Sequence, residues 1–216
     1  MMFRILSIVV FILSFVWIFR YMKKSDISLK NISDYYVAAL KNSLSNLKLI
    51  KSKKHSKNLE SLKNIVYLIS ILEFFVMVIT GFAPLIFIGN NLTGIFLLVH
   101  VTIAPIIAIT FAILVILFAH SNRFNNSDIT IADKNSGKRK INFKITSYLK
   151  LNFWLISLFS IPAMLSIILG MFPLFGTEGQ INLLETHRYS VLIISVLVIF
   201  HIGLLSVNNK QIIKSK

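Results

Sequence analysis

Residues 93–119 read TGIFLLVHVTIAPIIAITFAILVILFA, a run without a single charged side chain. A helix needs about 20 predominantly apolar residues to cross about 30 Å of hydrocarbon. Further runs of this kind occupy residues 2–19, 64–88, 151–172 and 189–207, and 56% of the 216 residues are hydrophobic, against roughly 45–50% in soluble domains. The sequence therefore predicts an all-α integral membrane helical bundle with five transmembrane helices.

The charges of the intervening segments alternate along the chain. Segment 20–63 holds eleven Lys or Arg and three acids, segment 120–150 holds seven and two, and the tail 208–216 holds three Lys and no acid. Segment 89–92 has no charge, and segment 173–186 has only Glu178 and Glu185. Because basic segments stay on the cytoplasmic side, we expect the N-terminus outside and the C-terminus in the cytoplasm.

The first apolar run has two interpretations, a signal peptide or an uncleaved anchor. Only Arg4 precedes most of the run, whereas Arg20, Lys23 and Lys24 follow it, and no small-x-small cleavage site occurs before Arg20. Signal peptides carry their positive charge before the apolar stretch. The pattern favours an anchor whose N-terminus lies outside.

The chain is predicted to have four parts. They are an N-terminal transmembrane anchor at 1–20, a basic cytoplasmic segment at 21–63, a four-helix membrane domain at 64–207 and a cytoplasmic tail at 208–216. Within the basic segment, apolar residues at 36, 39, 40, 44, 47 and 50 recur at helical spacing. Segment 32–50 is therefore either an amphipathic helix on the inner leaflet or a solvated linker. Segment 122–142 is polar and predicts a cytoplasmic loop.

Composition restricts the chemistry. The chain has no cysteine, which excludes disulfides and thiolate-bound iron–sulfur clusters. The net charge of +15 would suggest nucleic acid in a soluble protein, but in a membrane protein it marks cytoplasmic segments. We expect no nucleic-acid partner. Any redox chemistry needs a cofactor held by other ligands, and the five histidines are the candidates.

Four histidines lie in or beside the predicted spans, whereas His55 lies among lysines and reads as a solvated side chain. His100 lies inside the third span and His201 inside the fifth, where ionisable groups are costly and usually functional. His187 precedes His201 by fourteen residues, or about 3.9 turns and about 21 Å, so both leave one helix face. That separation suits two haems, one near each leaflet.

The third and fifth spans run in the same direction, so His100 and His187 share the outer leaflet. A haem between them would have two histidine ligands. His201 indicates a second haem nearer the inside. His120, at the inner end of the third span, is either its second ligand or an interfacial histidine beside Arg123. His120 follows His100 by twenty residues, so on a straight helix it lies on roughly the opposite face. Pro105 can bend the helix and change that relation.

These residues resemble the bacterial cytochrome b561-like family, which includes the cytochrome b subunits of formate dehydrogenase and nickel–iron hydrogenase. The resemblance covers about residues 57–207 and leaves the first span as an addition to a four-helix haem-binding core. It rests on four stretches: Thr80-Gly81-Phe82, Gly94 with His100, Thr186-His187-Arg188-Tyr189, and His201-Ile202-Gly203. One departure concerns the family's histidine near the start of the first core helix, where this chain has Leu62-Lys63-Asn64-Ile65-Val66.

The resemblance implies a membrane-bound b-type cytochrome of the bacterial inner membrane, with one or two haems b. It further implies a hydrophilic redox subunit as partner and electron exchange with quinone. The chain shows no Gly-rich nucleotide loop and no hydrolase triad, so we expect an electron-transfer subunit of an oxidoreductase complex, without catalytic residues apart from a quinone pocket. The competing expectation is a haem-free structural subunit or a small proton-coupled transporter.

Glu73 lies inside the second span. Surrounding hydrocarbon favours the neutral form of a carboxyl group. Such a group can relay a proton, to a quinone for example, or hydrogen-bond within the bundle, and both interpretations stay open. The other polar residues of the spans, Thr102, Thr110, Ser157 and Ser166, are most simply helix-packing residues.

Overall fold

The computed structural model describes residues 2–25, 27, 33, 37–38, 41, 45, 55–89, 92–125, 128–132, 140–172 and 174–214. Apart from isolated positions, segment 32–50, expected to be an amphipathic helix or a solvated linker, lies outside the described residues. The side chain of His55 lies outside them as well.

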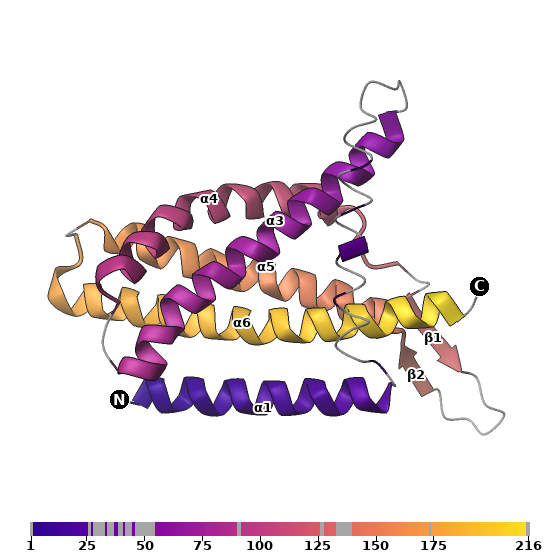
Figure 1. Ribbon diagram of the computed structural model, residues 1–216, viewed down its shortest axis with the longest axis horizontal. Helices are drawn as coiled ribbons and strands as arrows, with labels where there is room; N and C mark the ends of the chain where they lie inside the picture. Colours follow the sequence, from indigo (N-terminus) through magenta and orange to yellow (C-terminus); the bar gives the residue numbers. More distant parts are fainter. Residues whose placement is uncertain are drawn as a thin grey trace. The chain divides into compact units, whose positions relative to one another are not determined.

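The fold class is all-α, as the sequence predicts. The long helices are α1 (Met2–Lys24), α3 (His55–Ala83), α4 (Gly94–Ala119), α5 (Ile145–Gly170) and α6 (Gly176–Lys214), and a short π-helical segment η1 (Pro84–Ile88) continues α3 (Figure 1). Within the described residues, five helices are long and apolar enough to cross a membrane. The chain is thus a multi-pass integral membrane protein, and its helix surfaces expose large apolar side chains, as contact with lipid requires.

Three helices begin earlier than the apolar runs indicate. The α3 helix starts at His55 and α5 at Ile145, against predicted starts at 64 and 151. The expected loop 173–186 is wrong for most of its length, because α6 begins at Gly176 and carries Glu178 in its first turn. An apolar run marks only the stretch in hydrocarbon, whereas the hydrogen-bonded helix continues through Lys, Glu and Gln, which are good helix formers.

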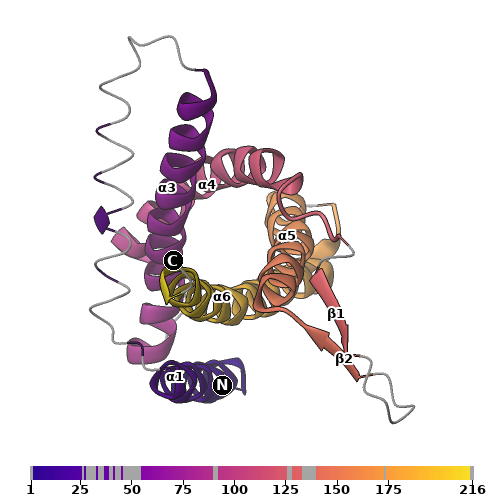
Figure 2. The same cartoon turned by 90° about the vertical axis from the view of Figure 1, so that its right-hand side faces the viewer.

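The chain divides into two compact units, one made of Met1–Val9 with Ser28–His120 and the other of Val10–Ile27 with Ser121–Lys216. In the first unit α3 packs along α4, and in the second unit α5 packs along α6 (Figure 2). Each pair is joined by a short connection, so its helices run antiparallel.

In the first unit, Arg4 caps the C-terminal end of η1. Its Nε and Nη2 donate to the carbonyl oxygen of Ile86 at 3.2 and 2.8 Å. Gly89 ends the segment at φ 77°, a conformation that glycine adopts without steric cost. A Cβ on Gly89 would lie 2.5 Å from Arg4 Nη1. The ring of Phe3 stacks on that of Phe82 with centroids 6.3 Å apart, so the N-terminal turns belong to the packed structure.

In the second unit, α1 approaches α6 where α6 has a glycine. A Cβ on Gly203 would lie 1.7 Å from Ile18 Cδ1 and 2.8 Å from Ile18 Cγ1. Ile18 is itself buried. One helical turn away, the rings of Trp17 and Phe200 meet edge to face at 4.4 Å. The absence of a side chain at position 203 therefore permits the approach of these two helices.

We expect Gly203→Ala to lower the thermal unfolding temperature of the protein in detergent, because Ile18 must leave its packed position. Overpacking of this kind typically costs about 1–3 kcal/mol. Ile18→Val removes Cδ1 and should restore most of the loss in the double variant. Gly170→Ala is the matched control, since its Cβ would meet only Gln180 Oε1 at 3.6 Å. Equal unfolding temperatures for the 203 and 170 variants would contradict this account.

The connection between α4 and α5 contains two strands that the sequence interpretation missed. Strands β1 (Ile129–Ala132) and β2 (Lys140–Phe143) pair antiparallel with Ile129 opposite Phe143. The polar composition of 122–142 suggested only a loop, because strands of four residues are too short to show a clear alternation. This ribbon is a minor addition to the all-α fold.

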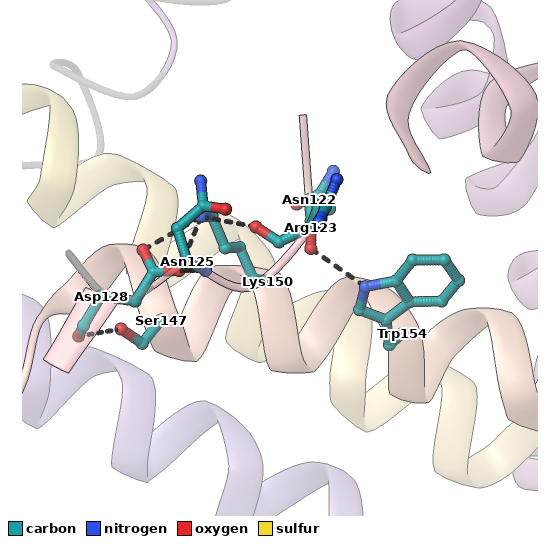
Figure 3. A network of polar contacts seen from close by, with 7 residues as sticks. All are labelled: Asn122, Arg123, Asn125, Asp128, Ser147, Lys150 and Trp154. Carbon is teal, nitrogen blue, oxygen red and sulfur yellow. Dashed lines mark hydrogen bonds and ion pairs between the residues drawn. The ribbon is translucent and has the colours of Figure 1, made fainter. Parts of the chain in front are cut away.

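A polar network holds the base of the ribbon against α5 (Figure 3). Lys150 Nζ lies 2.8 and 3.0 Å from the two carboxylate oxygens of Asp128 and donates to the Arg123 carbonyl at 2.9 Å. The Asn125 N–H donates to Asp128 Oδ2 at 2.7 Å, and Ser147 Oγ donates to the Asp128 carbonyl at 2.6 Å. Asp128 thus connects the segment after α4 to the first turns of α5.

The hydrogen bond from Lys150, followed by that from the Asn125 N–H, holds the pKa of Asp128 below its ordinary value. The carboxylate therefore stabilises the fold above the unfolded-state pKa of about 3.9, and this contribution is lost as the pH falls through the lower folded-state pKa. We expect Asp128→Asn to unfold at a lower temperature than wild type at pH 7 and at nearly the same temperature at the acid end of a titration. A difference that is independent of pH would contradict the ionic contribution.

Candidate functional site

His100 lies on α4, half-buried in the first unit, and faces α3. Its Nδ1 is 3.0 Å from Thr80 Oγ1. The Thr80 hydroxyl is 2.8 Å from the carbonyl of Val76, one turn earlier. Because a hydroxyl has a single proton and a carbonyl can only accept, Thr80 donates to Val76 and accepts from His100 Nδ1–H. The second ring nitrogen, Nε2, then carries the lone pair that a metal can bind.

Gly81 lets the ring of His100 come close to α3. A Cβ at this position would lie 3.2 Å from Cε1 and 3.6 Å from Nδ1 of the imidazole. The Thr80-Gly81 pair noted in the sequence therefore has a structural role beside His100. The threonine holds one ring nitrogen, and the glycine provides the space beside it.

His187 lies on α6 in the second unit and makes an equivalent contact to α5. Its Nδ1 is 2.8 Å from the carbonyl oxygen of Ala163. A carbonyl can only accept, so Nδ1 carries the proton and Nε2 again carries the lone pair. Ser166 Oγ donates to the same carbonyl at 3.1 Å. His187 lies well inside α6, which begins at Gly176.

His201 lies on the same α6 helix, half-buried, with its Nδ1 atom inside the protein. The unbroken helix from His187 to His201 keeps both residues on one face, as the fourteen-residue spacing predicts. His120 is the C-cap residue of α4 and is exposed. It belongs to the first unit, and its role as a second ligand to an inner haem stays a prediction.

Glu73 on α3 is half-buried and hydrogen-bonded to Thr110 of α4. The sequence interpretation treated Thr110 as one of several packing residues. Three others, Thr102, Ser157 and Ser166, do donate to carbonyls of their own helices. The antiparallel register distinguishes Thr110, because Glu73 precedes Thr80 by seven residues and Thr110 follows His100 by ten. A comparison of how far each residue lies along its helix from Thr80 or His100 could have identified this pair from the sequence.

The structure therefore brings together some of the predicted residues. His100 meets Thr80 and Gly81, Glu73 meets Thr110, and His187 shares a helix face with His201. His100 and His187 belong to different units, so their pairing on one iron stays a prediction from the sequence. Among the described residues, no three His, Asp or Glu side chains gather as a metal-binding cluster, and a haem iron between two histidines does not need such a cluster.

The two histidines also satisfy a general requirement for metal ligands. A histidine that binds a metal almost always donates its other ring N–H to an oxygen acceptor, which fixes the tautomer and the ring orientation. Thr80 and Ala163 supply such acceptors for His100 and His187. Comparison of the chain with protein-family models, curated proteins and solved structures finds no significant match.

Proposed function

We propose that this protein is a membrane-bound b-type cytochrome subunit that transfers electrons between a hydrophilic redox partner protein and membrane quinone. The observation that supports it best is the state of two histidines in the spans. His100 and His187 each donate Nδ1–H to an oxygen of a neighbouring helix, which places the lone pair of each ring on Nε2. This is the ligand state that haem iron requires.

Each residue has a defined task in this proposal. His100 and His187 bind the iron of an outer haem b, and Thr80 and the Ala163 carbonyl hold their tautomers. The His201 imidazole, on the same face of α6 as His187, is the candidate ligand of a second, inner haem, for which His120 is either the second ligand or an interfacial histidine outside the site. When bound, haem supplies the one-electron ferric–ferrous couple, while the protein supplies ligation, burial and orientation.

The proposed orientation places the N-terminus outside and the C-terminus in the cytoplasm of a bacterial inner membrane. The support is the alternation of basic and non-basic segments along the sequence. The hydrophilic partner and quinone come from the family resemblance. The direction of electron flow then depends on the reduction potentials of those partners.

The direct test is a reduced-minus-oxidised absorption spectrum of the protein purified from haem-replete cells. The proposal predicts the bands of haem b, with one or two haems per chain by pyridine haemochrome assay. A colourless, haem-free preparation that is folded and monodisperse would refute it.

The hydrogen bond between Glu73 and Thr110 supports an alternative, a haem-free, proton-coupled transporter. A carboxyl group inside the spans is a natural proton-binding group. In that case Glu73→Gln should abolish proton-coupled uptake in vesicles, and Thr110→Val should reduce it. Ser157→Ala is the control, because in the part of the chain that the structure describes Ser157 bonds only within its own helix. Haem-loaded protein whose spectrum is unchanged by Glu73→Gln favours the cytochrome instead.

A further inference from the structure

We infer that Arg123 and the exposed face of α5 beside it form a docking surface for an anionic phospholipid. The headgroup phosphate binds the Arg123 guanidinium, and an acyl chain lies along the helix. All the residues of this surface belong to the second unit. The inference goes beyond the proposed function, because it needs neither a haem nor a redox partner.

The apolar part of this surface is a stripe of exposed side chains on α5. Large apolar residues recur there every three or four positions, which places them on one side of the helix. They are Leu151, Trp154, Leu158, Ile161 and Leu165, and each is at least 39% exposed. From the first to the last is fourteen residues, or about 21 Å. One leaflet contributes only about 15 Å of hydrocarbon, so the stripe can accommodate an acyl chain along its length.

Trp154 marks the polar end of the stripe. Its indole Nε1 donates a hydrogen bond to the carbonyl oxygen of Asn122 at 3.0 Å, so the ring is tied to the segment that follows α4. Tryptophan is enriched where the hydrocarbon of a bilayer meets the headgroups. The hydrogen bond therefore places Asn122 and the residue after it, Arg123, at the level where lipid headgroups begin.

The polar network at the base of the ribbon holds Arg123 by its backbone. Lys150 Nζ donates to the Arg123 carbonyl at 2.9 Å, and Lys150 precedes Trp154 by about one turn of α5 (Figure 3). Residues 122 and 123 are thus fixed against α5 between Lys150 and Trp154. The Arg123 side chain itself is exposed, and it forms no ion pair with the part of the chain that the structure describes.

The charges around Arg123 are complementary to a phosphate group. The carboxylate of Asp128 is already held by Lys150 Nζ at 2.8 and 3.0 Å, and Lys144 at the start of α5 adds a second exposed cation. A guanidinium binds phosphate through two parallel hydrogen bonds, and basic residues beside a membrane attract anionic lipids. A soluble phosphate has no use for the apolar stripe, so the combination favours a phospholipid.

The test uses brominated lipids, which quench the fluorescence of a tryptophan that they touch. The chain has two tryptophans, Trp17 and Trp154, so Trp17→Phe leaves Trp154 as the reporter of this surface. In mixed bilayers, brominated phosphatidylglycerol should quench Trp154 more strongly than brominated phosphatidylcholine at the same fraction. Arg123→Gln should lower this preference about five-fold, the contribution of one basic residue at an anionic surface. Arg123→Lys keeps the charge and should retain most of the preference.

Trp154→Phe provides the matched control, because Trp17 then reports from α1, where its ring contacts Tyr21 and Phe200. Arg123→Gln should leave the quenching of Trp17 unchanged. Equal quenching of Trp154 by the two lipids, or an unchanged preference in Arg123→Gln, would overturn the inference. Loss of the preference in excess inorganic phosphate at matched ionic strength would also overturn it, because the surface would then bind phosphate without an acyl chain.

If Trp17→Phe does not fold, native mass spectrometry replaces the fluorescence measurement. Wild type and Arg123→Gln, both with their two tryptophans, are compared for bound phosphatidylglycerol. Wild type should retain more of this lipid than the variant, and equal retention would overturn the inference.

Discussion

His187→Ala and His100→Ala should each remove the outer haem from the purified protein. Each substitution deletes a proposed iron ligand whose ring is hydrogen-bonded to the neighbouring helix. Loss of an outer-shell partner alone typically costs 10–100-fold in metal affinity. Loss of the ligand itself should therefore reduce outer-haem content to below about a tenth of wild type.

The measurement is the pyridine haemochrome assay on protein whose helicity and monodispersity match wild type. His55→Ala is the control, because the sequence assigns His55 to the basic segment. His120→Ala is measured in parallel and should remove the inner haem if His120 ligates it. Full outer-haem content in both His187→Ala and His100→Ala would exclude these residues as ligands. Full haem content in His120→Ala would show that another residue is the second ligand of the inner haem.

Thr80→Val should have the next largest effect, although Thr80 is not itself a ligand. Valine has nearly the shape of threonine but offers His100 no acceptor for its Nδ1–H. The ring then loses its fixed tautomer and orientation. We expect the affinity for the outer haem to fall about 10–100-fold, with a change in its midpoint potential.

Two variants make this prediction specific. Thr80→Ser keeps the hydroxyl and should retain most of the haem affinity. Thr102→Val removes a hydroxyl that lies two residues from His100 and, among the described residues, bonds only to the Leu98 carbonyl of its own helix, so it should behave as wild type. Haem titration of the three proteins decides the question. Equal affinities for Thr80→Val and Thr102→Val would show that the Thr80 hydroxyl does not position His100.

Much of the fold could be predicted from the sequence because the long helices follow directly from the runs of hydrophobic residues. The run 93–119 and α4 (Gly94–Ala119) nearly coincide, since Gly94 and the polar residues after Ala119 bound both the apolar stretch and the helix. At α6 the agreement fails at the N-terminal end. There the helix starts at Gly176, and its polar first turns carry no hydropathy signal.

The candidate site could be predicted only in part. The fourteen residues between His187 and His201 place both on one helix face, and no tertiary structure is needed for that result. The acceptors for the Nδ1 atoms could not be predicted in the same way. One is a threonine hydroxyl and the other is a backbone carbonyl, and every helix offers many of both.

By itself, the sequence determined the number of long apolar helices, the charge alternation that predicts their orientation, and the positions of the histidines that are candidate ligands. These features depend on composition and on the 3.6-residue period of one helix, both of which are local. Only the tertiary structure decided which side chains meet across helices, such as Thr80 with His100, Glu73 with Thr110 and Ile18 with Gly203. Those contacts depend on the register and rotation of one helix against another. Close packing at small residues and individual hydrogen bonds set both quantities, and neither leaves a periodic pattern in the sequence.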